Sequence, residues 1–259
     1  MSACVCGRIF RVNATSCNLT VLRQEAVAPD ISRLVVQWQD PSREPHAGQF
    51  YMLKPGHSSA PFLPRPISMY DAQDGNVKLL IGVFGEGTAM LCACTPGSQI
   101  DITGPHGNGF PHAEGDIVLV GGAAGAAPLY YLAKELRAID PNRRILGFVG
   151  FNGKCEPSEF IHDAMREVCD EVHMNYGGFV TRDVDYSLVA TYFACGPDPM
   201  MRDCHACASK CSATLYVSMD ERMACGVGAC LCCVCHTKSG PKRSCKDGPV
   251  FLSSEVYYE

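Results

Sequence analysis

Cys225-Gly-Val-Gly-Ala-Cys230-Leu-Cys-Cys233, with Cys245 following after eleven further residues, is the stretch of this chain that says most about its fold. Cysteines in a C-x4-C-x2-C pattern, completed by a fourth on a separate segment, are ligands of [2Fe–2S] clusters. Gly226 and Gly228 allow the loop to curl around such a cluster, because glycine accepts positive φ and close backbone approach. The pattern therefore predicts a one-electron redox centre. Its four ligands are Cys225, Cys230, Cys233 and Cys245.

Two further cysteines, Cys232 and Cys235, lie in the same run and leave alternatives open. A zinc ribbon would use C-x2-C pairs such as Cys230/Cys233 or Cys232/Cys235. The x4 spacing with two glycines is not a zinc-knuckle spacing, and this favours the iron–sulfur cluster. The remaining alternative is a set of buried thiols that bind no metal.

The composition describes a globular chain rich in loops, with 25 glycines and 17 prolines in 259 residues, long enough for about two domains. A net charge of −5 gives no reason to expect a nucleic-acid partner. Seventeen cysteines would suggest disulfides in a secreted protein, but residues 1–8 lack the apolar core of a signal peptide. The longest apolar run, residues 117–133, is interrupted by glycines and a proline. We therefore expect a protein of the reducing cytoplasm, outside the membrane.

The chain divides into three patterns. Short β-branched runs separated by glycine and proline fill residues 7–110 and favour a β-barrel; they are residues 31–38, 50–53, 77–84 and 100–103. From about residue 113 to 215, expected strands at 116–120, 144–151 and 188–195 alternate with helices, including one at 126–139, which predicts a parallel sheet. The expected fold is a β-barrel domain (1–111), an α/β parallel-sheet nucleotide-binding domain (112–215) and a small C-terminal [2Fe–2S] domain (216–259).

Two motifs in the β-rich part favour a flavin. The guanidinium of Arg65, in Arg65-Pro66-Ile67-Ser68, offers a fork for a pyrophosphate, while backbone and hydroxyl groups beside it can reach a flavin ring. Alone, this tetrapeptide is equally consistent with a surface turn. Gly85-Glu-Gly87-Thr88 precedes an expected helix at 88–92, and a glycine turn at a helix N-terminus suits a phosphate. The two motifs together favour FAD.

Two turns in the α/β part favour a second nucleotide. Gly121-Gly122-Ala-Ala-Gly125 separates a strand from a helix, and its small residues would let phosphates approach the helix N-terminus, although a plain tight turn is the alternative. Cys195-Gly196-Pro197 ends a later strand of the same sheet. Because ligands bind outside the carboxyl ends of parallel strands, both turns should flank one crevice. Cys195 would border a nicotinamide ring there, or be a buried structural thiol.

The spacing Cys204-x2-Cys207-x3-Cys211 is consistent with a second metal site, but it also matches one buried face of a helix. We favour the helix face.

With these motifs in order, the sequence resembles the ferredoxin–NADP reductase superfamily and, more closely, the electron-transfer subunits of type B, NAD-dependent dihydroorotate dehydrogenases. The resemblance covers nearly the whole chain and is strongest over residues 221–230 and 245–251. It implies FAD in the barrel, NAD on the nucleotide-binding domain and a [2Fe–2S] cluster at the C-terminus. The residues it implies for FAD are Arg65, Pro66, Ile67 and Ser68, a flavin-contacting strand at Leu80, Ile81 and Gly82, and a phosphate turn at Gly87 and Thr88.

The resemblance also implies a partner and a reaction. An FMN-containing catalytic subunit would oxidise dihydroorotate, and the electrons would pass through the cluster and FAD of this chain to NAD⁺. Two copies of each subunit would form a heterotetramer. No acid or base is assigned in this chain. The alternatives are a subunit of another NAD(P)H-linked flavin and iron–sulfur oxidoreductase, such as a ferredoxin reductase, hydrogenase or sulfur reductase, and a zinc-binding module without redox function. Relatives often carry a third glycine and an isoleucine in the nucleotide turn, where this chain has alanines.

Overall fold

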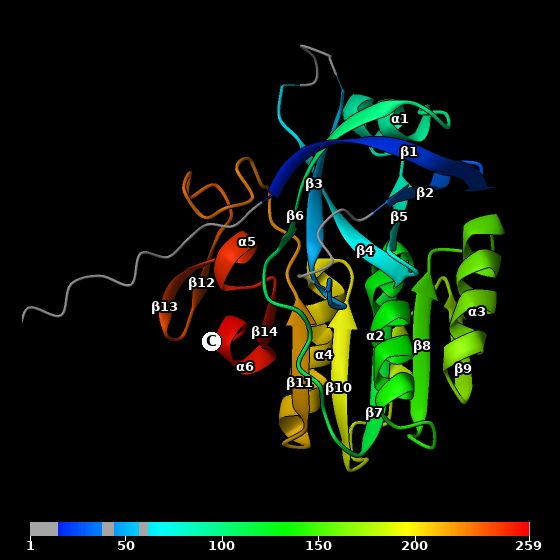
Figure 1. The fold of residues 1–259 in the computed structure, drawn as a ribbon. Helices are drawn as coiled ribbons and strands as arrows, with labels where there is room; N and C mark the ends of the chain where they lie inside the picture. Colours follow the sequence, from blue (N-terminus) through cyan, green and yellow to red (C-terminus); the bar gives the residue numbers. More distant parts are fainter. Residues whose placement is uncertain (1–14, 38–43, 57–61, 259) are drawn as a thin grey trace, which may run out of the picture.

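The computed structural model describes residues 15–37, 44–56 and 62–258. They form a β-barrel, a six-stranded sheet flanked by helices, and a C-terminal segment that lies beside both (Figure 1). The barrel and the parallel sheet expected from the sequence are therefore both present. No helix in the described part of the chain is long and apolar enough to cross a membrane.

The barrel is closed and antiparallel, with the strand order β1-β2-β5-β4-β3-β6. Strict alternation builds its core: in β2, Leu34 and Val36 point inward while Arg33 and Val35 face out, as the two-residue period of a strand requires. A short helix, α1, follows β5 at one end of the barrel. The elements are β1 (Thr15–Ala28), β2 (Ile31–Gln37), β3 (Phe50–Pro55), β4 (Arg65–Gln73), β5 (Asn76–Gly82), α1 (Glu86–Cys92) and β6 (Gln99–His106).

The second sheet has the order β14-β11-β10-β7-β8-β9, and all its strands are parallel except β14. Its strands are β7 (Asp116–Gly122), β8 (Ile145–Phe151), β9 (Glu171–Tyr176), β10 (Ala190–Cys195), β11 (Thr214–Ser218) and β14 (Val250–Leu252). Its helices are α2 (Ala126–Ile139), α3 (Glu156–Val168) and α4 (Asp198–Lys210), with short 3-10 turns η1 (Ala123–Gly125) and η2 (Val180–Arg182). The expected helix over residues 126–139 coincides with α2.

The C-terminal segment contributes to the nucleotide-binding sheet as well as carrying the cysteines. After β11 an irregular loop leads to the hairpin β12 (Val234–Thr237) and β13 (Gly240–Arg243), then α5 (Ser244–Asp247), β14 and α6 (Ser253–Val256). Strand β14 pairs antiparallel with β11, so this segment is tied to the sheet's edge. The domain boundaries at 111/112 and 215/216 stay proposals from the sequence; β11 spans the second.

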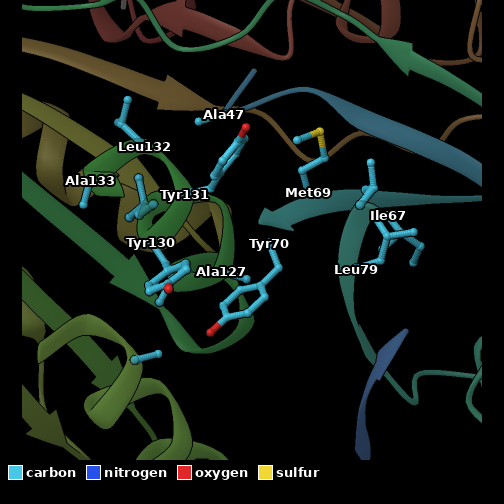
Figure 2. Packing of buried hydrophobic residues seen from close by; sticks show 14 of the residues in the cluster. Ala47, Ile67, Met69, Tyr70, Leu79, Ala127, Tyr130, Tyr131, Leu132 and Ala133 are labelled. Atoms are coloured by element: carbon cyan, nitrogen blue, oxygen red, sulfur yellow. The ribbon is translucent and has the colours of Figure 1, made fainter. Parts of the chain in front are cut away.

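Helix α2 joins the barrel to the sheet. Tyr70 of β4 stacks on Tyr130 of α2 with ring centroids 4.7 Å apart, and Figure 2 shows Tyr130 and Tyr131 between barrel and helix residues. Beside them the buried carboxylate of Asp71 accepts hydrogen bonds from Lys78 of the barrel and Lys134 of α2, both at 2.7 Å. A buried charge needs such pairing, so this junction holds the two parts in one arrangement.

Candidate cofactor sites

The loop between β11 and β12 has the curl that the sequence predicts. Gly226 has φ +68° and Gly228 has φ +78°, a region that favours glycine. A Cβ at position 226 would lie 2.6 Å from Cγ of Met52 in β3, and one at 228 would lie 2.8 Å from Cδ of Lys246. The loop can therefore pass between the barrel and α5 only with glycines at these two positions.

Backbone amides in this loop point at cysteine sulfurs. The N–H groups of Val227, Ala229 and Cys230 donate to Cys225 Sγ at 3.3–3.5 Å. Burial by itself raises the pKa of Cys225, but these donors outweigh it and lower the pKa to about 6. Cys225 is thus a thiolate at neutral pH, the form that ligates metals.

The four candidate ligands fall into two pairs. Cys225 interacts with Cys230, and Cys245 with Cys233, whose sulfur also accepts the Cys245 backbone N–H at 3.4 Å. Burial, followed by its hydrogen bond with Cys233, raises the pKa of Cys245 to about 12. Two pairs of sulfurs match the two irons of a [2Fe–2S] cluster.

A single zinc ion fits this arrangement less well. Zinc would gather at least three sulfurs at about 3.8 Å from one another, given Zn–S bonds of about 2.3 Å in a tetrahedron. Among the described residues, no three cysteine sulfurs lie within 4.8 Å of one another. Cys232 is exposed, and the thiol of Cys235 donates to the carbonyl of Lys242 at 3.6 Å. Neither of these two cysteines joins the pairs.

The two pairs of sulfurs differ in exposure. Cys233 and Cys245 are each 2 % exposed and pack against Phe50 and Met52 of β3, whereas Cys230 is exposed. A cluster held here would have one side against the barrel and the other at the surface.

Arg65 and Gly87 bring the two flavin motifs together. A Cβ on Gly87 would lie 2.6–2.7 Å from the guanidinium atoms of Arg65, so that side chain rests on the Cα of Gly87. The hydroxyl of Thr88 accepts the backbone N–H groups of Phe84 and Gly85 and donates to the carbonyl of Gly85, which fixes the turn. A guanidinium and a glycine turn at one end of the barrel suit a pyrophosphate.

The other proposed FAD residues contribute in different ways. The side chains of Ile67 and Ile81 belong to the buried core, so only their backbone can face a ligand, while Ser68 is exposed and Leu80, Pro66 and Gly82 are half-buried. Sequence reasoning missed Phe84, whose ring is 87 % exposed between β5 and the Gly85 turn. An aromatic residue placed directly before a glycine turn was the available signal, since such a ring can stack on a flavin or adenine.

The two turns of the second sheet meet, as expected from the sequence. A Cβ on Gly125 would lie 2.2 Å from the Cys195 carbonyl oxygen, and one on Gly122 would lie 2.7 Å from Cδ of Pro197. Gly121 pairs with Cys195 across β7 and β10, and Gly196 packs on Gly122. Burial raises the pKa of Cys195 to about 12 despite a hydrogen bond from Ser218, so its thiol is neutral.

The interpretation of Cys204, Cys207 and Cys211 as one helix face is only partly correct. Cys204 and Cys207 lie within α4, and Cys204 is buried against Tyr186. Cys211 is the C-terminal cap of the helix and is exposed.

Comparisons with known proteins agree with this geometry. Residues 220–257 match the family model for the iron–sulfur cluster binding domain of dihydroorotate dehydrogenase B. The structure resembles that of an NADH-dependent reduced ferredoxin-NADP oxidoreductase, with a TM-score of 0.80 and 26 % identity over 92 % of this chain and 89 % of that one. A ferredoxin NADP⁺ reductase from Neisseria gonorrhoeae, 15 % identical with a TM-score of 0.61, covers 80 % of this chain and 94 % of its own, and shares the fold.

The fold and sites thus define a reductase of the ferredoxin–NADP reductase type that carries an iron–sulfur domain. The electron transfer subunit of dihydroorotate dehydrogenase B (NAD⁺) from Clostridium acetobutylicum is 37 % identical over 218 residues, covering 82 % of this chain and 87 % of its own length. That from Caldanaerobacter subterraneus is 35 % identical over 245 residues, covering 92 % and 97 %. This chain belongs to the family of dihydroorotate dehydrogenase B electron transfer subunits, which confirms the resemblance seen in the sequence.

Proposed function

We propose that this chain is the electron-transfer subunit of an NAD-dependent dihydroorotate dehydrogenase, with FAD, a [2Fe–2S] cluster and NAD as its cofactors. The observation that carries the proposal is the packing of the buried Cys233/Cys245 pair on β3, in the same barrel whose end holds Arg65 and Gly87. Cys230, in contrast, is exposed at the protein surface. The cysteine loop therefore spans from the protein surface to the flavin barrel.

When bound, the cluster carries single electrons, and the flavin exchanges one or two electrons and a hydride with NAD. The protein's share is binding, positioning and electrostatics. Amides of residues 227–230 stabilise negative charge on the sulfurs. The Arg65 guanidinium neutralises pyrophosphate charge.

Residues of the α/β sheet position the second nucleotide. Gly121, Gly122 and Gly125 let its phosphates reach the N-terminus of α2. The neutral thiol of Cys195 borders the nicotinamide and is the one side chain we place against the reacting ring. Chemistry at dihydroorotate belongs to a partner subunit.

We propose that the partner carries FMN, that two copies of each subunit assemble, and that the exposed tip at Leu231, 60 % exposed, faces the partner. A cytoplasmic location fits the fourteen cysteines whose side chains are described, all of which are free thiols.

The test uses the complex purified anaerobically with its catalytic partner. Dihydroorotate should produce orotate in step with NAD⁺ reduction, and flavin and iron–sulfur absorbance should bleach. Cofactors that bleach with NADH but never with dihydroorotate would contradict the proposal and indicate a ferredoxin-, hydrogen- or sulfur-linked partner. Native mass spectrometry of the same sample tests the two-plus-two assembly.

A matched pair of variants tests the route within the complex. Cys230→Ala should abolish dihydroorotate-linked NAD⁺ reduction, while the partner still reduces an artificial dye and this subunit still oxidises NADH with a dye. Cys232→Ala, an exposed neighbour, should retain all three activities. Loss of NAD⁺ reduction in both variants, or in neither, would contradict the assigned ligands.

A further inference from the structure

Three metal-ligating side chains meet where the barrel joins the nucleotide-binding sheet. His46 lies in the connection before β3, His112 in the connection between β6 and β7, and Glu135 in α2. Their ligand atoms all lie within 4.8 Å of one another. His46 Nδ1 is 3.4 Å from Glu135 Oε1, and the His46 and His112 rings meet edge-on with centroids 6.3 Å apart. None of the three belongs to the cofactor sites described above.

The backbone around these side chains is held from several directions. The hydroxyl of Tyr131 in α2 donates to the carbonyl of Pro45 at 3.1 Å, and Figure 2 shows Tyr131 beside Ala47. The N–H of Phe110 donates to the carbonyl of Ala47 at 2.8 Å. A Cβ on Gly109 would lie 2.8 Å from that same oxygen, so the two connections pack closely. The segments that carry His46 and His112 are therefore fixed against each other and against α2.

The two oxygens of Glu135 have separate partners. Oε2 accepts the Ala47 N–H at 3.1 Å, and Oε1 faces His46. Such a hydrogen bond orients a carboxylate ligand in metal sites.

Two imidazoles and one carboxylate form a recognised donor set for Zn²⁺, which completes its tetrahedron with water. Imidazole also suits Ni²⁺ and Cu²⁺. An ion pair between His46 and Glu135 alone would not require His112, whereas a metal uses all three groups.

We propose that His46, His112 and Glu135 bind one divalent transition metal, Zn²⁺ or a metal of similar preference, and that this metal links the flavin barrel to the nucleotide-binding sheet. A metal that binds only the folded protein stabilises it by mass action. Because its ligands come from both parts, it would also hold the barrel in a fixed position relative to the two turns that carry Gly122 and Gly196. The proposal is independent of the substrate of the partner subunit.

The test uses the full chain with FAD and the cluster loaded, so that the cluster thiols are already occupied. Zn²⁺ is titrated by calorimetry, and Co²⁺ is added separately as a spectroscopic probe. The variants are His112→Gln and Glu135→Gln, and His236→Gln, an exposed histidine on β12, is the matched control. Circular dichroism and FAD content show whether each variant is folded. If Glu135→Gln does not fold, the test rests on His112→Gln alone, because His112 is exposed and its replacement should leave the fold intact.

Wild type and His236→Gln should each bind one equivalent of Zn²⁺. The variants His112→Gln and Glu135→Gln should bind it about 100-fold more weakly, because losing even an outer-shell partner of a metal costs roughly 10–100-fold in affinity. Zn²⁺ should also raise the midpoint of thermal unfolding of wild type and His236→Gln, but not that of the two site variants. The Co²⁺ spectrum of that site should lack thiolate charge-transfer bands. Equal stoichiometry and affinity in all four proteins, or a site that shows thiolate bands, would overturn the proposal.

Discussion

The guanidinium of Arg65 rests on the Cα of Gly87, so that a side chain at position 87 would occupy the place of that guanidinium. Arg65 is the first residue of β4, and Gly87 lies in the first turn of α1, which follows β5 along the chain. Neither motif is specific alone. Their contact makes a single site that offers a planar cation and a close backbone approach together, which is what a pyrophosphate requires.

We expect Gly87→Ala to lose FAD. The new Cβ would lie within 2.7 Å of three guanidinium atoms and push Arg65 out of place. FAD affinity should fall at least about tenfold, or about 1.4 kcal/mol, measured by flavin fluorescence during titration of the deflavinated protein. Gly153→Ala is the control, because a Cβ there meets no atom within 4 Å. Equal FAD affinity in the two variants would contradict the assigned site.

Much of the fold follows from local patterns in the sequence. Strands β2 and β5 are buried on one face, and their alternating apolar residues show this in the sequence. Strand β7, before the Gly121 turn, is buried on both faces, and its continuous apolar run shows that equally directly. Strand β4 was missed because a bulge between Met69 and Asp71 breaks its alternation. Strand β14 has three residues, too few for a period, and its place depends on pairing with β11.

The candidate sites were predictable to a similar extent. The spacing of the cysteines indicated their ligand role because a short loop must deliver them. Spacing could not show that Cys232 is exposed while the adjacent Cys233 is buried against β3. Likewise, nothing local indicates that His46, His112 and Glu135 meet, since each comes from a different connection or helix.

We expect Cys233→Ala to lose the iron–sulfur cluster and Cys232→Ala to keep it. The two residues are neighbours of identical chemistry, but only Cys233 pairs with Cys245. Iron content and the electron paramagnetic resonance signal of the reduced protein should be nearly abolished in the first variant and unchanged in the second. A cluster signal that survives in Cys233→Ala would exclude this ligand set.

We expect Cys195→Ala to slow flavin reduction by NADH while FAD stays bound. The backbone of Cys195 lies at the carboxyl end of β10 against the Gly125 turn, where we expect its thiol to position the nicotinamide. Stopped-flow reduction at saturating NADH should be slower by about tenfold, about 1.4 kcal/mol of barrier. Cys211→Ala, an exposed thiol at the end of α4, is the control. Unchanged kinetics in Cys195→Ala would remove this residue from the site.

We expect Ala123→Gly to stabilise the protein. Ala123 is exposed and has φ +47°, a left-handed conformation that costs a residue with a Cβ about 1–2 kcal/mol. Glycine also gives the unfolded chain more conformational entropy, which offsets part of this effect. The free energy of unfolding, measured with urea, should therefore rise by about 0.5–1 kcal/mol. Ala124→Gly is the matched control, because Ala124 itself has no positive φ and glycine there should destabilise. If both substitutions changed the free energy of unfolding in the same direction, the positive φ of Ala123 would not be the cause.

We expect the buried thiol at the C-terminal cap of α3 to make stability fall at alkaline pH. Burial raises the pKa of Cys169 from 9.0 to about 12. A group whose pKa is raised on folding stabilises fully below its unfolded pKa, so this contribution is complete below pH 9 and is lost as pH rises towards 12. At pH 10 the loss is about 1.4 kcal/mol. Cys169→Ala should be less stable than wild type at pH 7, because it leaves a cavity, and the gap in urea unfolding free energy should narrow by that amount at pH 10. A gap that does not change between the two pH values would mean that the thiol titrates normally.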